Sequence, residues 1–474
     1  MDTQGSLAGL FGGRFGGPLM VTLDVVQAQH ADRAAVEGRQ QRRLQALLKS
    51  ARERVPRYRQ LLQGVDLERL ALEQLPRSDK SMLMADFEGH LSDPTLRLDG
   101  LRSFCADPAQ IGLRFDRRCW AWESSGSSGV PALYVQDSDA MTVYDALEAC
   151  RRHPSQVWRR WLDPWYLGER FAFVGATGGH FASVVSVQRL RRMHPSLQTG
   201  WRCFSLLEPM PALCAALDDF APTLLATYPT AAVALAEQVR SGRLQHCRPR
   251  EVWTGGEALT PAMRSRIESA FGCEVRQSYG ASEFLPIAWE CRAQGLHVNA
   301  DWVILEPVDA QGRRMPPGRR SHTTLLTNLA NHLQPLVRFD IGDRIVLDER
   351  PCRCGSALPL VRVEGRCDDV LTMAGAGAAS VHLLPLALTT VLEDHAGLFD
   401  FELRQADAHR LRLGIGPGAA SGPAALRRYR QVLTTFLREQ GVERPSLGLH
   451  RLKDSPLQAR AGRAGKCKRV FAAQ

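Results

Sequence analysis

Apolar side chains recur at helical spacing near the start of the chain. Over about residues 32–62 the sequence is rich in Arg and Gln, and apolar positions return every three or four residues. Four of these positions fall on one face of the predicted helix: Leu44, Leu47, Leu48 and Ala51. Because a helix with one apolar face packs that face against other elements, we expect an amphipathic packing helix here.

Short apolar runs alternate with amphipathic segments between about residues 110 and 350. Four runs end in small or polar residues: FAFVGA (171–176), TLLATY (223–228), EVWTGG (251–256) and EVRQSYG (274–280). This alternation predicts an α/β fold with a mostly parallel sheet and crossover helices. Ligands in such sheets bind beyond the carboxyl ends of the strands, and the unusual residue clusters of this chain lie at those ends.

The composition changes after about Gly365. AGAGAAS (374–380) has too little side chain to pack a core and predicts a loop, and apolar, Arg-rich segments follow it. A chain of 474 residues is too long for one ordinary core. We expect a large, multi-lobed N-terminal domain over residues 1–366 and a small, mobile α+β C-terminal domain over residues 367–474.

Composition excludes several classes of protein. The hydrophobic share of 44% and the charged share of 23% are typical of a globular protein. The net charge of +10 comes from scattered basic residues, which predicts no nucleic-acid binding, and no apolar run is long enough to predict a membrane span. Twelve Cys without a secretory leader favour a reducing compartment, so we expect a cytoplasmic protein.

A Ser/Gly run occupies residues 124–131, SSGSSGVP. Backbone amides without bulky side chains, interleaved with hydroxyls, can surround the oxygens of a polyphosphate. No Gly-Lys-Ser/Thr follows, so this is not a Walker sequence. A flexible loop explains the run equally well from the residues alone.

Two further clusters follow predicted strands. Gly255, Gly256 and Glu257 precede a helix that we expect to begin near Thr260 and Pro261, and a plain turn is the alternative for them. The second cluster is Ser278, Tyr279, Gly280, Ala281, Ser282 and Glu283. It combines an aromatic ring, an open backbone, a hydroxyl and a carboxylate, groups that can stack on a base, contact phosphate and hold magnesium. A plain turn is again the alternative.

Cysteine and histidine are spaced as metal ligands in two segments. Cys291 and His297 lie in WECRAQGLHVN, and Cys352 and Cys354 lie in PCRCGS. Three thiolates and one imidazole satisfy tetrahedral zinc, and a closed set of four ligands is the structural type. The alternative is a group of free core thiols beside a hydrogen-bonded histidine.

Taken in order, these clusters resemble the adenylate-forming (acyl-CoA synthetase or AMP-binding) superfamily, and within it the phenylacetate-CoA ligase branch. The resemblance runs from ALLKSARERVPRYRQLL and LPRSDKSMLMADF through SSGSSGVP, GGEALTPAMRSRIESAFG, SYGASEF and PLVRFDIGD to VEGRCDDVL and GKCKRV. It implies ATP- and magnesium-dependent adenylation of a carboxylic acid, in this branch an aromatic one, to acyl-AMP with release of pyrophosphate. The acyl group then passes to a thiol, with CoA as the expected acceptor.

The resemblance also implies roles for the matching residues. The β and γ phosphates would be held by Ser124, Ser125, Gly126, Ser127, Ser128 and Gly129. Gly256 and Glu257 would line the adenine pocket, and Tyr279 would face the ring from a segment that also includes Ser278, Gly280 and Ala281. Ser282 would lie near the α-phosphate and the acyl carboxylate, and Glu283 would bind magnesium.

Three more roles come from the second half of the chain. Asp343 and Arg366 would bind the ribose hydroxyls, although a turn aspartate and a surface ion pair are the alternatives. Lys466 would neutralise charge at the α-phosphate, with Lys468 as the rival candidate and a solvated basic tail as the alternative. Asp368 falls where the superfamily keeps its hinge.

The chain departs from the branch at two places. Ser127, Ser128 and Val130 stand where many relatives have Thr-Thr and Lys, and AGAGAASVHLLP replaces a Gly-Val-Asn-Val-Phe-Pro type of segment near the thiol acceptor. Transfer to a carrier-protein thiol or to a cofactor therefore stays open, as does a nucleotide-binding protein without catalysis. A homodimer is compatible with the resemblance.

The acyl pocket is expected around three residues: His180, Tyr228 and Gly255. His180 is equally well explained as a structural histidine.

Overall fold

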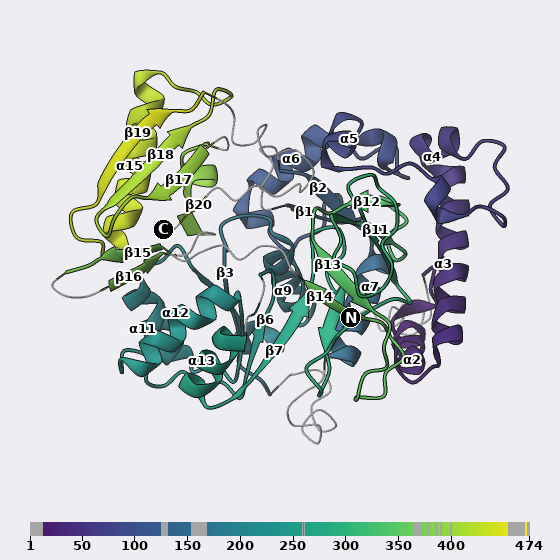
Figure 1. Cartoon of the computed structure of the whole chain (residues 1–474), viewed down its shortest axis with the longest axis horizontal. Helices are drawn as coiled ribbons and strands as arrows, with labels where there is room; N and C mark the ends of the chain where they lie inside the picture. Colours follow the sequence, from purple (N-terminus) through teal and green to yellow (C-terminus); the bar gives the residue numbers. More distant parts are fainter. Residues whose placement is uncertain are drawn as a thin grey trace. The chain divides into compact units, whose positions relative to one another are not determined.

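The structure is a computed structural model of the chain (Figure 1). It describes residues 13–124, 131–152, 168–257, 259, 261–363, 371–376, 380–383, 387–388, 391–398, 401–453 and 470–471. The chain divides into two compact units. The first comprises residues 1–124, 132–166 and 277–364, and the second comprises residues 125–131, 167–276 and 365–474.

The helices of the first unit are α2 (Gly17–Gln29), α3 (Arg33–Arg54), α4 (Pro56–Leu61), α5 (Lys80–Ala85), α6 (Leu98–Ala106) and α7 (Ser138–Arg151). Short 3₁₀ turns lie at Leu72–Gln74, Glu88–His90 and Pro108–Gln110. None of the described helices combines the length and apolar character needed to cross a membrane.

The predicted N-terminal helix is confirmed as the pair α3 and α4. Asp32 caps α3 by accepting a hydrogen bond from the backbone N–H of Ala35 at 2.8 Å. Pro56 starts α4, as expected of a residue whose missing N–H is harmless in a first helical turn. The predicted apolar face is buried, and it packs with Leu329 and Val337.

The strands of the first unit pair antiparallel. They are β1 (Trp120–Glu123), β2 (Leu133–Gln136), β8 (Ala288–Glu290), β9 (Leu296–Val298), β10 (Val303–Val308), β11 (Thr323–Asn328), β12 (Phe339–Asp340), β13 (Ile345–Asp348) and β14 (Leu360–Val363), joined by the end of β7 (Glu274–Tyr279). β1 pairs with β2, β11 lies between β10 and β12, and the order in the remaining sheet is β7-β8-β9-β14-β13. The prediction of a mostly parallel sheet is wrong for this region, because connections as short as residues 291–295 allow only hairpins.

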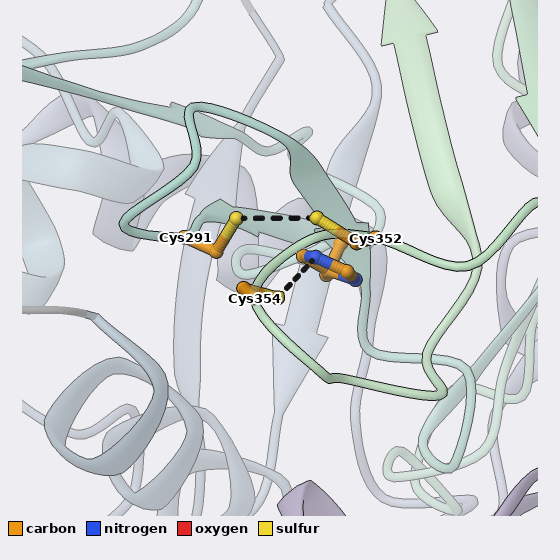
Figure 2. A group of neighbouring side chains, drawn as sticks. Cys291, Cys352 and Cys354 are labelled. Carbon is orange, nitrogen blue, oxygen red and sulfur yellow. Dashed lines mark hydrogen bonds between the residues drawn. The ribbon is translucent and has the colours of Figure 1, made fainter.

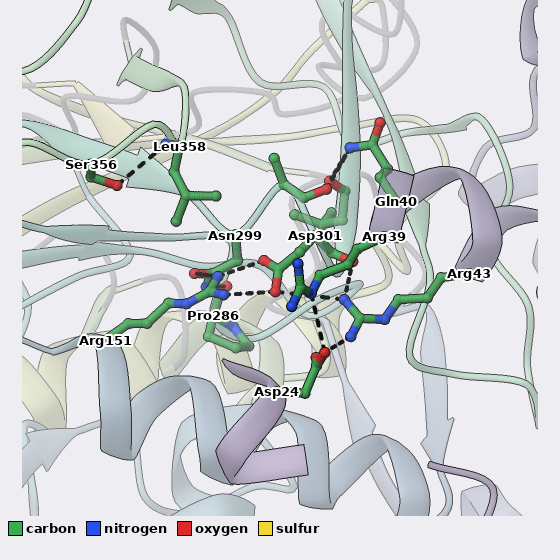
Figure 3. Close-up of polar contacts among 12 residues, drawn as sticks. Asp24, Arg39, Gln40, Arg43, Arg151, Pro286, Asn299, Asp301, Ser356 and Leu358 are labelled. Carbon is green, nitrogen blue, oxygen red and sulfur yellow. Dashed lines mark hydrogen bonds and ion pairs between the residues drawn. The ribbon is translucent and has the colours of Figure 1, made fainter. Parts of the chain in front are cut away.

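Buried ion pairs tie the helices of the first unit to the segment after β9 (Figure 3). Arg151, the last residue of α7, donates two hydrogen bonds of 2.6 Å to the carboxylate of Asp301, and both side chains are fully buried. Arg43 of α3 donates to the Asp301 backbone oxygen at 2.6 Å, pairs with Asp24 of α2 and lies 3.5 Å above the ring of Trp302. Burial would raise the pKa of Asp301, but the Arg151 guanidinium outweighs it and holds that pKa below its usual value.

The second unit contains the parallel strands that the sequence predicts. These are β3 (Phe171–Gly175), β4 (Trp201–Ser205), β5 (Leu224–Thr227) and β6 (Glu251–Thr254), in the order β6-β5-β3-β4. The helices between and after them are α9 (Ala182–Met193), α10 (Leu197–Gly200), α11 (Met210–Phe220), α12 (Pro229–Arg240) and α13 (Pro261–Phe271). The start of α13 confirms the predicted helix boundary.

The C-terminal residues form the expected α+β arrangement. Their elements are β15 (Leu371–Ala374), β16 (Ser380–Leu383), a π-helical turn (Val391–His395), β17 (Phe401–Gln405), β18 (Arg410–Ile415), α15 (Pro423–Glu439), β19 (Ser446–Arg451) and β20 (Val470–Phe471). β15 and β16 pair as a hairpin around the predicted loop, and α15 packs its apolar side on the sheet β19-β18-β17-β20 (Figure 1). Their apolar residues share one cluster with those of residues 172–275, so the domain boundary at residues 366 and 367 stays a prediction.

Candidate functional site

The turn after β7 has a shape that only glycine permits at one position. A Cβ added to Gly280 would lie 2.0 Å from the backbone oxygen of Leu285, far inside van der Waals contact. Ala281 and Phe284 close the turn by exchanging backbone hydrogen bonds of 3.1 and 3.2 Å. Ser282 and Glu283, two of the predicted site residues, are therefore held at the tip of a tightly closed turn.

Glu283 has a buried partner that sequence analysis did not identify. The hydroxyl of Tyr134 on β2 donates a hydrogen bond of 2.6 Å to Glu283 Oε1, and Glu283 is 5% exposed. Burial and the nearby Glu283 charge hold the pKa of Tyr134 well above its usual value, so the phenol remains a donor. The Asn328 side chain fixes the backbone of Glu283 by donating a hydrogen bond of 2.9 Å to its carbonyl oxygen.

The turn is also held on either side of Glu283. Trp122 on β1 donates from its indole Nε1 to the carbonyl oxygen of Ser282 at 2.9 Å. The Asn299 side chain donates a hydrogen bond to the carbonyl oxygen of Pro286, and the same side chain accepts a hydrogen bond of 2.8 Å from Arg151 (Figure 3). Backbone carbonyls at three positions of the turn are thus fixed by side chains from distant segments.

Glu283 offers the chemistry of a magnesium ligand. Its carboxylate is buried and accepts the Tyr134 hydrogen bond at Oε1. Carboxylate oxygens are the ligands that Mg²⁺ prefers, and a buried carboxylate is stabilised by a cation. The side chain therefore fits the predicted role, which stays a prediction.

Tyr279 and Asp343, which are 64 residues apart, are brought together as a pair. The Tyr279 hydroxyl donates to Asp343 Oδ2 at 2.6 Å, and the two residues are 7% and 4% exposed. Thr324 also donates to the Asp343 carbonyl oxygen at 2.8 Å. The prediction had placed Tyr279 at the base and Asp343 at the ribose of one nucleotide, and both roles stay predictions.

Ser124 closes the base of the Ser/Gly run. Its backbone N–H donates to the Ala132 oxygen at 2.8 Å, and its Oγ accepts from the Ala132 N–H at 3.0 Å. The residue is buried, so its hydroxyl oxygen serves this closure. Ser125, Gly126, Ser127, Ser128 and Gly129 lie outside the described residues.

In the second unit, the ends of β5 and β6 bring predicted residues together around one aromatic ring. A Cβ on Gly256, whose φ is +79°, would lie 3.1 Å from the ring of Tyr228. Burial raises the pKa of Tyr228, the negative charge of Glu257 raises it further, and a hydrogen bond with the backbone of Ala176 acts against both. The ring therefore lies against the backbone of Gly256, which follows Gly255 in sequence.

His180 is 1% exposed and follows the glycine pair of GATGGH. Its role in an acyl pocket stays a prediction. Arg366, Asp368, Lys466 and its rival Lys468 lie outside the described residues. The described chain resumes at β20, which pairs in parallel with β17.

The four predicted zinc ligands converge in the first unit (Figure 2). Their ligand atoms all lie within 4.8 Å of one another. Cys291 follows β8 and has its Sγ 3.7 Å from Cys352 Sγ, while Cys354 Sγ lies 3.2 Å from His297 Nε2. Tetrahedral zinc with metal–sulfur bonds of about 2.3 Å separates two thiolates by roughly 3.8 Å, close to the observed sulfur separation.

The surroundings of this Cys/His cluster favour metal binding by the histidine. His297 Nδ1 donates to the Leu358 carbonyl oxygen at 2.7 Å, which directs Nε2 at Cys354. Burial lowers the pKa of His297 and so favours the neutral imidazole. A Cβ on Gly295 would lie only 2.7 Å from Leu360 Cδ2 and in ordinary contact with the sulfurs of Cys352 and Cys291, so this glycine makes room for the Leu360 side chain beside the cluster. Sequence analysis had given Gly295 no role.

Comparison with known proteins agrees with the motifs. The sequence model of the AMP-binding enzyme family matches residues 195–318. A phenylacetate-coenzyme A ligase of Thermus thermophilus is 29% identical over 187 residues, which cover 37% of this chain and 40% of that protein. Protein CapK of Staphylococcus aureus is 27% identical over 181 residues, covering 38% and 39%. The chain thus spans about two fifths of the length of the curated relatives it matches.

Solved structures extend the similarity in fold to most of the chain. A 2-hydroxyisobutyryl-CoA ligase in complex with 2-HIB-AMP and CoA superposes with a TM-score of 0.59, covering 94% of this chain and 91% of that one at 21% identity. The same ligase with R3-HIB-AMP gives a TM-score of 0.55. The resemblance predicted from the ordered motifs is confirmed: the chain carries an AMP-binding enzyme segment and has the α/β fold of the adenylate-forming CoA ligases.

Proposed function

We propose that this protein is an ATP-dependent acid–thiol ligase, which converts an aromatic carboxylic acid to its acyl-AMP and transfers the acyl group to CoA. The observation that carries the proposal is the pair of buried contacts Tyr279–Asp343 and Tyr134–Glu283 in one unit. They join the proposed base-stacking ring to the proposed ribose-binding carboxylate and hold the proposed metal-binding carboxylate, and both Tyr279 and Glu283 lie within the matched residues 195–318.

Two displacements account for the reaction. A carboxylate oxygen of the acid attacks the α-phosphorus of ATP, an O–P bond forms, the bond to the β-phosphate breaks, and pyrophosphate leaves with the electron pair. The thiol sulfur then attacks the acyl carbon, a thioester forms, AMP leaves and the thiol proton passes to solvent. The first step is required because a carboxylate is a poor electrophile, and the mixed anhydride supplies the leaving group.

The described residues take complementary parts in this scheme. Asp343 holds the Tyr279 hydroxyl through Oδ2, and its carboxylate would bind a ribose hydroxyl. Ser282 lies beside the Glu283 carboxylate at the tip of the turn, where the α-phosphate and the acid would meet. Bound magnesium would neutralise phosphate charge at Glu283.

The remaining nucleotide contacts are proposed from the resemblance. Gly256 and Glu257 would line the adenine pocket, and the run from Ser124 to Gly129 would hold the outer phosphates. Arg366 would bind the ribose, Lys466 would reach the α-phosphate, and Asp368 would act as the hinge that brings Lys466 in and later admits the thiol.

An aromatic acid is supported by the region around Tyr228. Its ring lies against the backbone of Gly256, and Gly255 and His180 are the other proposed lining residues. Glycines beside an aromatic ring leave a flat space, which suits a planar substrate.

Measuring ATP–pyrophosphate exchange over a panel of aryl and fatty acids, with and without CoA, tests the proposal. We expect exchange that depends on an aryl acid, and formation of the CoA thioester and AMP when CoA is added. Adenylation without thioester formation would redirect the second step to a carrier-protein thiol or to a cofactor. Absence of exchange across the panel, with ATP binding intact, would contradict adenylation.

We also propose structural zinc at the Cys/His cluster, where Cys291, His297, Cys352 and Cys354 would form a closed tetrahedral set. We expect about one zinc per chain by elemental analysis of the purified protein, and a fall in melting temperature on chelation. Cys354→Ser should lose the metal, while Cys214→Ser, at a buried cysteine outside the cluster, should retain it. Protein that contains no zinc and is unaffected by a chelator would rule the site out.

A further inference from the structure

The hairpin that carries the Ser/Gly run places two aromatic residues directly opposite each other. In the antiparallel register of β1 and β2, Trp122 is the partner of Tyr134. Both are fully buried, and the hydrogen bonds between Ser124 and Ala132 close the hairpin just beyond them. This cross-strand pair therefore lies close to the end of the hairpin that Ser124 and Ala132 close.

Each member of the pair contacts one of two consecutive residues in the turn after β7. The Trp122 indole donates to the Ser282 carbonyl oxygen at 2.9 Å, and the Tyr134 hydroxyl donates to Glu283 Oε1 at 2.6 Å. The partners are separated by 160 and 149 residues in sequence. The two contacts thus connect one hairpin to the turn at two points.

The polar atoms of the pair make hydrogen bonds that apolar packing alone would not require. Phenylalanine at position 134 would fill nearly the same space, and phenylalanine at position 122 would keep an aromatic ring, yet only the indole N–H and the phenol O–H reach the turn. Trp122 and Tyr134 are fully buried, so solvent does not compete for the two donor groups, and each bond helps to fix its acceptor. The pair consequently sets both the backbone position of Ser282 and the carboxylate orientation of Glu283.

We propose that Trp122 and Tyr134 are positioning residues that couple Ser282 to the magnesium-binding carboxylate of Glu283. Tyr134 orients the carboxylate through Oε1, and Trp122 holds the carbonyl group of Ser282. The paired strands β1 and β2 thereby fix these two consecutive residues together. The proposal rests on the proposed function, in which Glu283 is the magnesium ligand.

The Tyr134→Phe variant tests the tyrosine. We expect the Mg²⁺ concentration that half-saturates pyrophosphate exchange to rise about tenfold, while the rate at saturating Mg²⁺ falls less than about threefold, because one hydrogen bond to a charged group is lost. As a readout independent of activity, the thermal stabilisation produced by titrating Mg²⁺ at fixed ATP should need about tenfold more Mg²⁺.

Tyr58→Phe is the matched control. Tyr58 is also buried in the first unit, and its hydroxyl donates to the Pro335 carbonyl oxygen at 3.2 Å, not to the turn. Both variants lose a buried hydroxyl, so both should lower the melting temperature, but only Tyr134→Phe should change the dependence on Mg²⁺. Equal Mg²⁺ dependence in the two variants, by both readouts, would overturn the role of Tyr134.

Trp122→Phe and the double variant test the coupling. Trp122→Phe should mainly lower the maximal exchange rate, and the double variant should lose less than the product of the two single effects, since both act on one turn. A double variant whose loss of exchange rate equals the product of the two single losses would refute coupling between Trp122 and Tyr134. If the wild-type protein shows no pyrophosphate exchange, the proposed function is rejected. The role of the pair is then retained if Tyr134→Phe still weakens the thermal stabilisation by Mg²⁺, and it is rejected if that stabilisation is the same in the variant and in wild type.

Discussion

The two units fix their candidate site residues by different physical means. In the first unit, buried polar side chains such as Arg151, Asn299 and Asn328 bind charges and backbone carbonyls, and most of the buried polar residues that the structure describes lie in this unit. In the second unit, Tyr228 is packed against the backbone of Gly256 above an extended apolar cluster. Directional bonds fix a few groups sharply, whereas apolar packing fixes a shape and tolerates small adjustments.

The largest effect should come from breaking the buried charge network of the first unit. Asp301→Ala leaves the fully buried guanidinium of Arg151 without its carboxylate. Removing one partner of a buried ion pair typically costs about 3–5 kcal/mol. Urea unfolding should show this loss, while the control Asp99→Ala, at an exposed aspartate paired with Arg102, should leave the midpoint nearly unchanged. Similar midpoints for the two variants would contradict the contrast between the units.

A smaller loss is expected at the turn itself. Gly280→Ala forces a Cβ against the Leu285 backbone oxygen, and neither group can move without opening the turn. Overpacking of this kind costs about 1–3 kcal/mol, and the displacement of Ser282 and Glu283 should reduce exchange at least about tenfold. Gly422→Ala in the second unit, where an added Cβ meets nothing within 4 Å, is the control in the same assays. Full activity in Gly280→Ala would show that the turn adapts.

Acid should weaken the first unit through His332. This side chain is 3% exposed, and burial, with Arg14 and Arg54 nearby, lowers its pKa to about 3. A lowered folded-state pKa means that stability is complete above the unfolded pKa of about 6.5 and is lost as the pH falls toward 3. At pH 5 the loss is about 2 kcal/mol. Urea unfolding at pH 7.5 and pH 5 should show a smaller change in the free energy of unfolding for His332→Leu than for wild type. An equal change in both proteins would show that His332 is not the cause of the acid sensitivity.

The smallest loss of stability is predicted in the second unit, where the packing around Tyr228 can adjust. Gly256→Ala and Gly242→Ala both place a Cβ at a positive φ, +79° and +72°, but only the former meets a side chain, the ring of Tyr228. Both should lose about 1 kcal/mol from backbone strain, and the ring contact should add less than about 1 kcal/mol because an aromatic ring can shift slightly. A much larger difference between their unfolding midpoints would mean that this region is as rigid as the turn of the first unit.

Sequence patterns predicted the second unit better than the first. Its strands β3, β5 and β6 alternate with helices and produce a rhythm that can be recognised locally. In the first unit β8 and β9 have three residues each, too few to show a period, so their antiparallel pairing was not predicted. The helix at residues 32–62 was predicted because its apolar face repeats over several turns.

The candidate site was predictable where its residue types are rare. Cys291 and Cys354 stand out because cysteines at ligand spacing have few explanations, and the converging sulfurs agree with the prediction. Trp122 and Tyr134 carry no such signal, since an aromatic residue on a buried strand has the pattern of ordinary core. Their partners are also more than 100 residues away, a pairing that only the folded chain creates.

The closure between Ser124 and Ala132 has a consequence for engineering. Because two hydrogen bonds fix the ends of the intervening run, the register of β1 and β2 is set before the run begins. The run can thus be exchanged as a cassette, including the Thr-Thr and Lys version common among relatives, without re-registering the hairpin. Loop libraries anchored at these two residues would sample phosphate chemistry while leaving the scaffold unaltered.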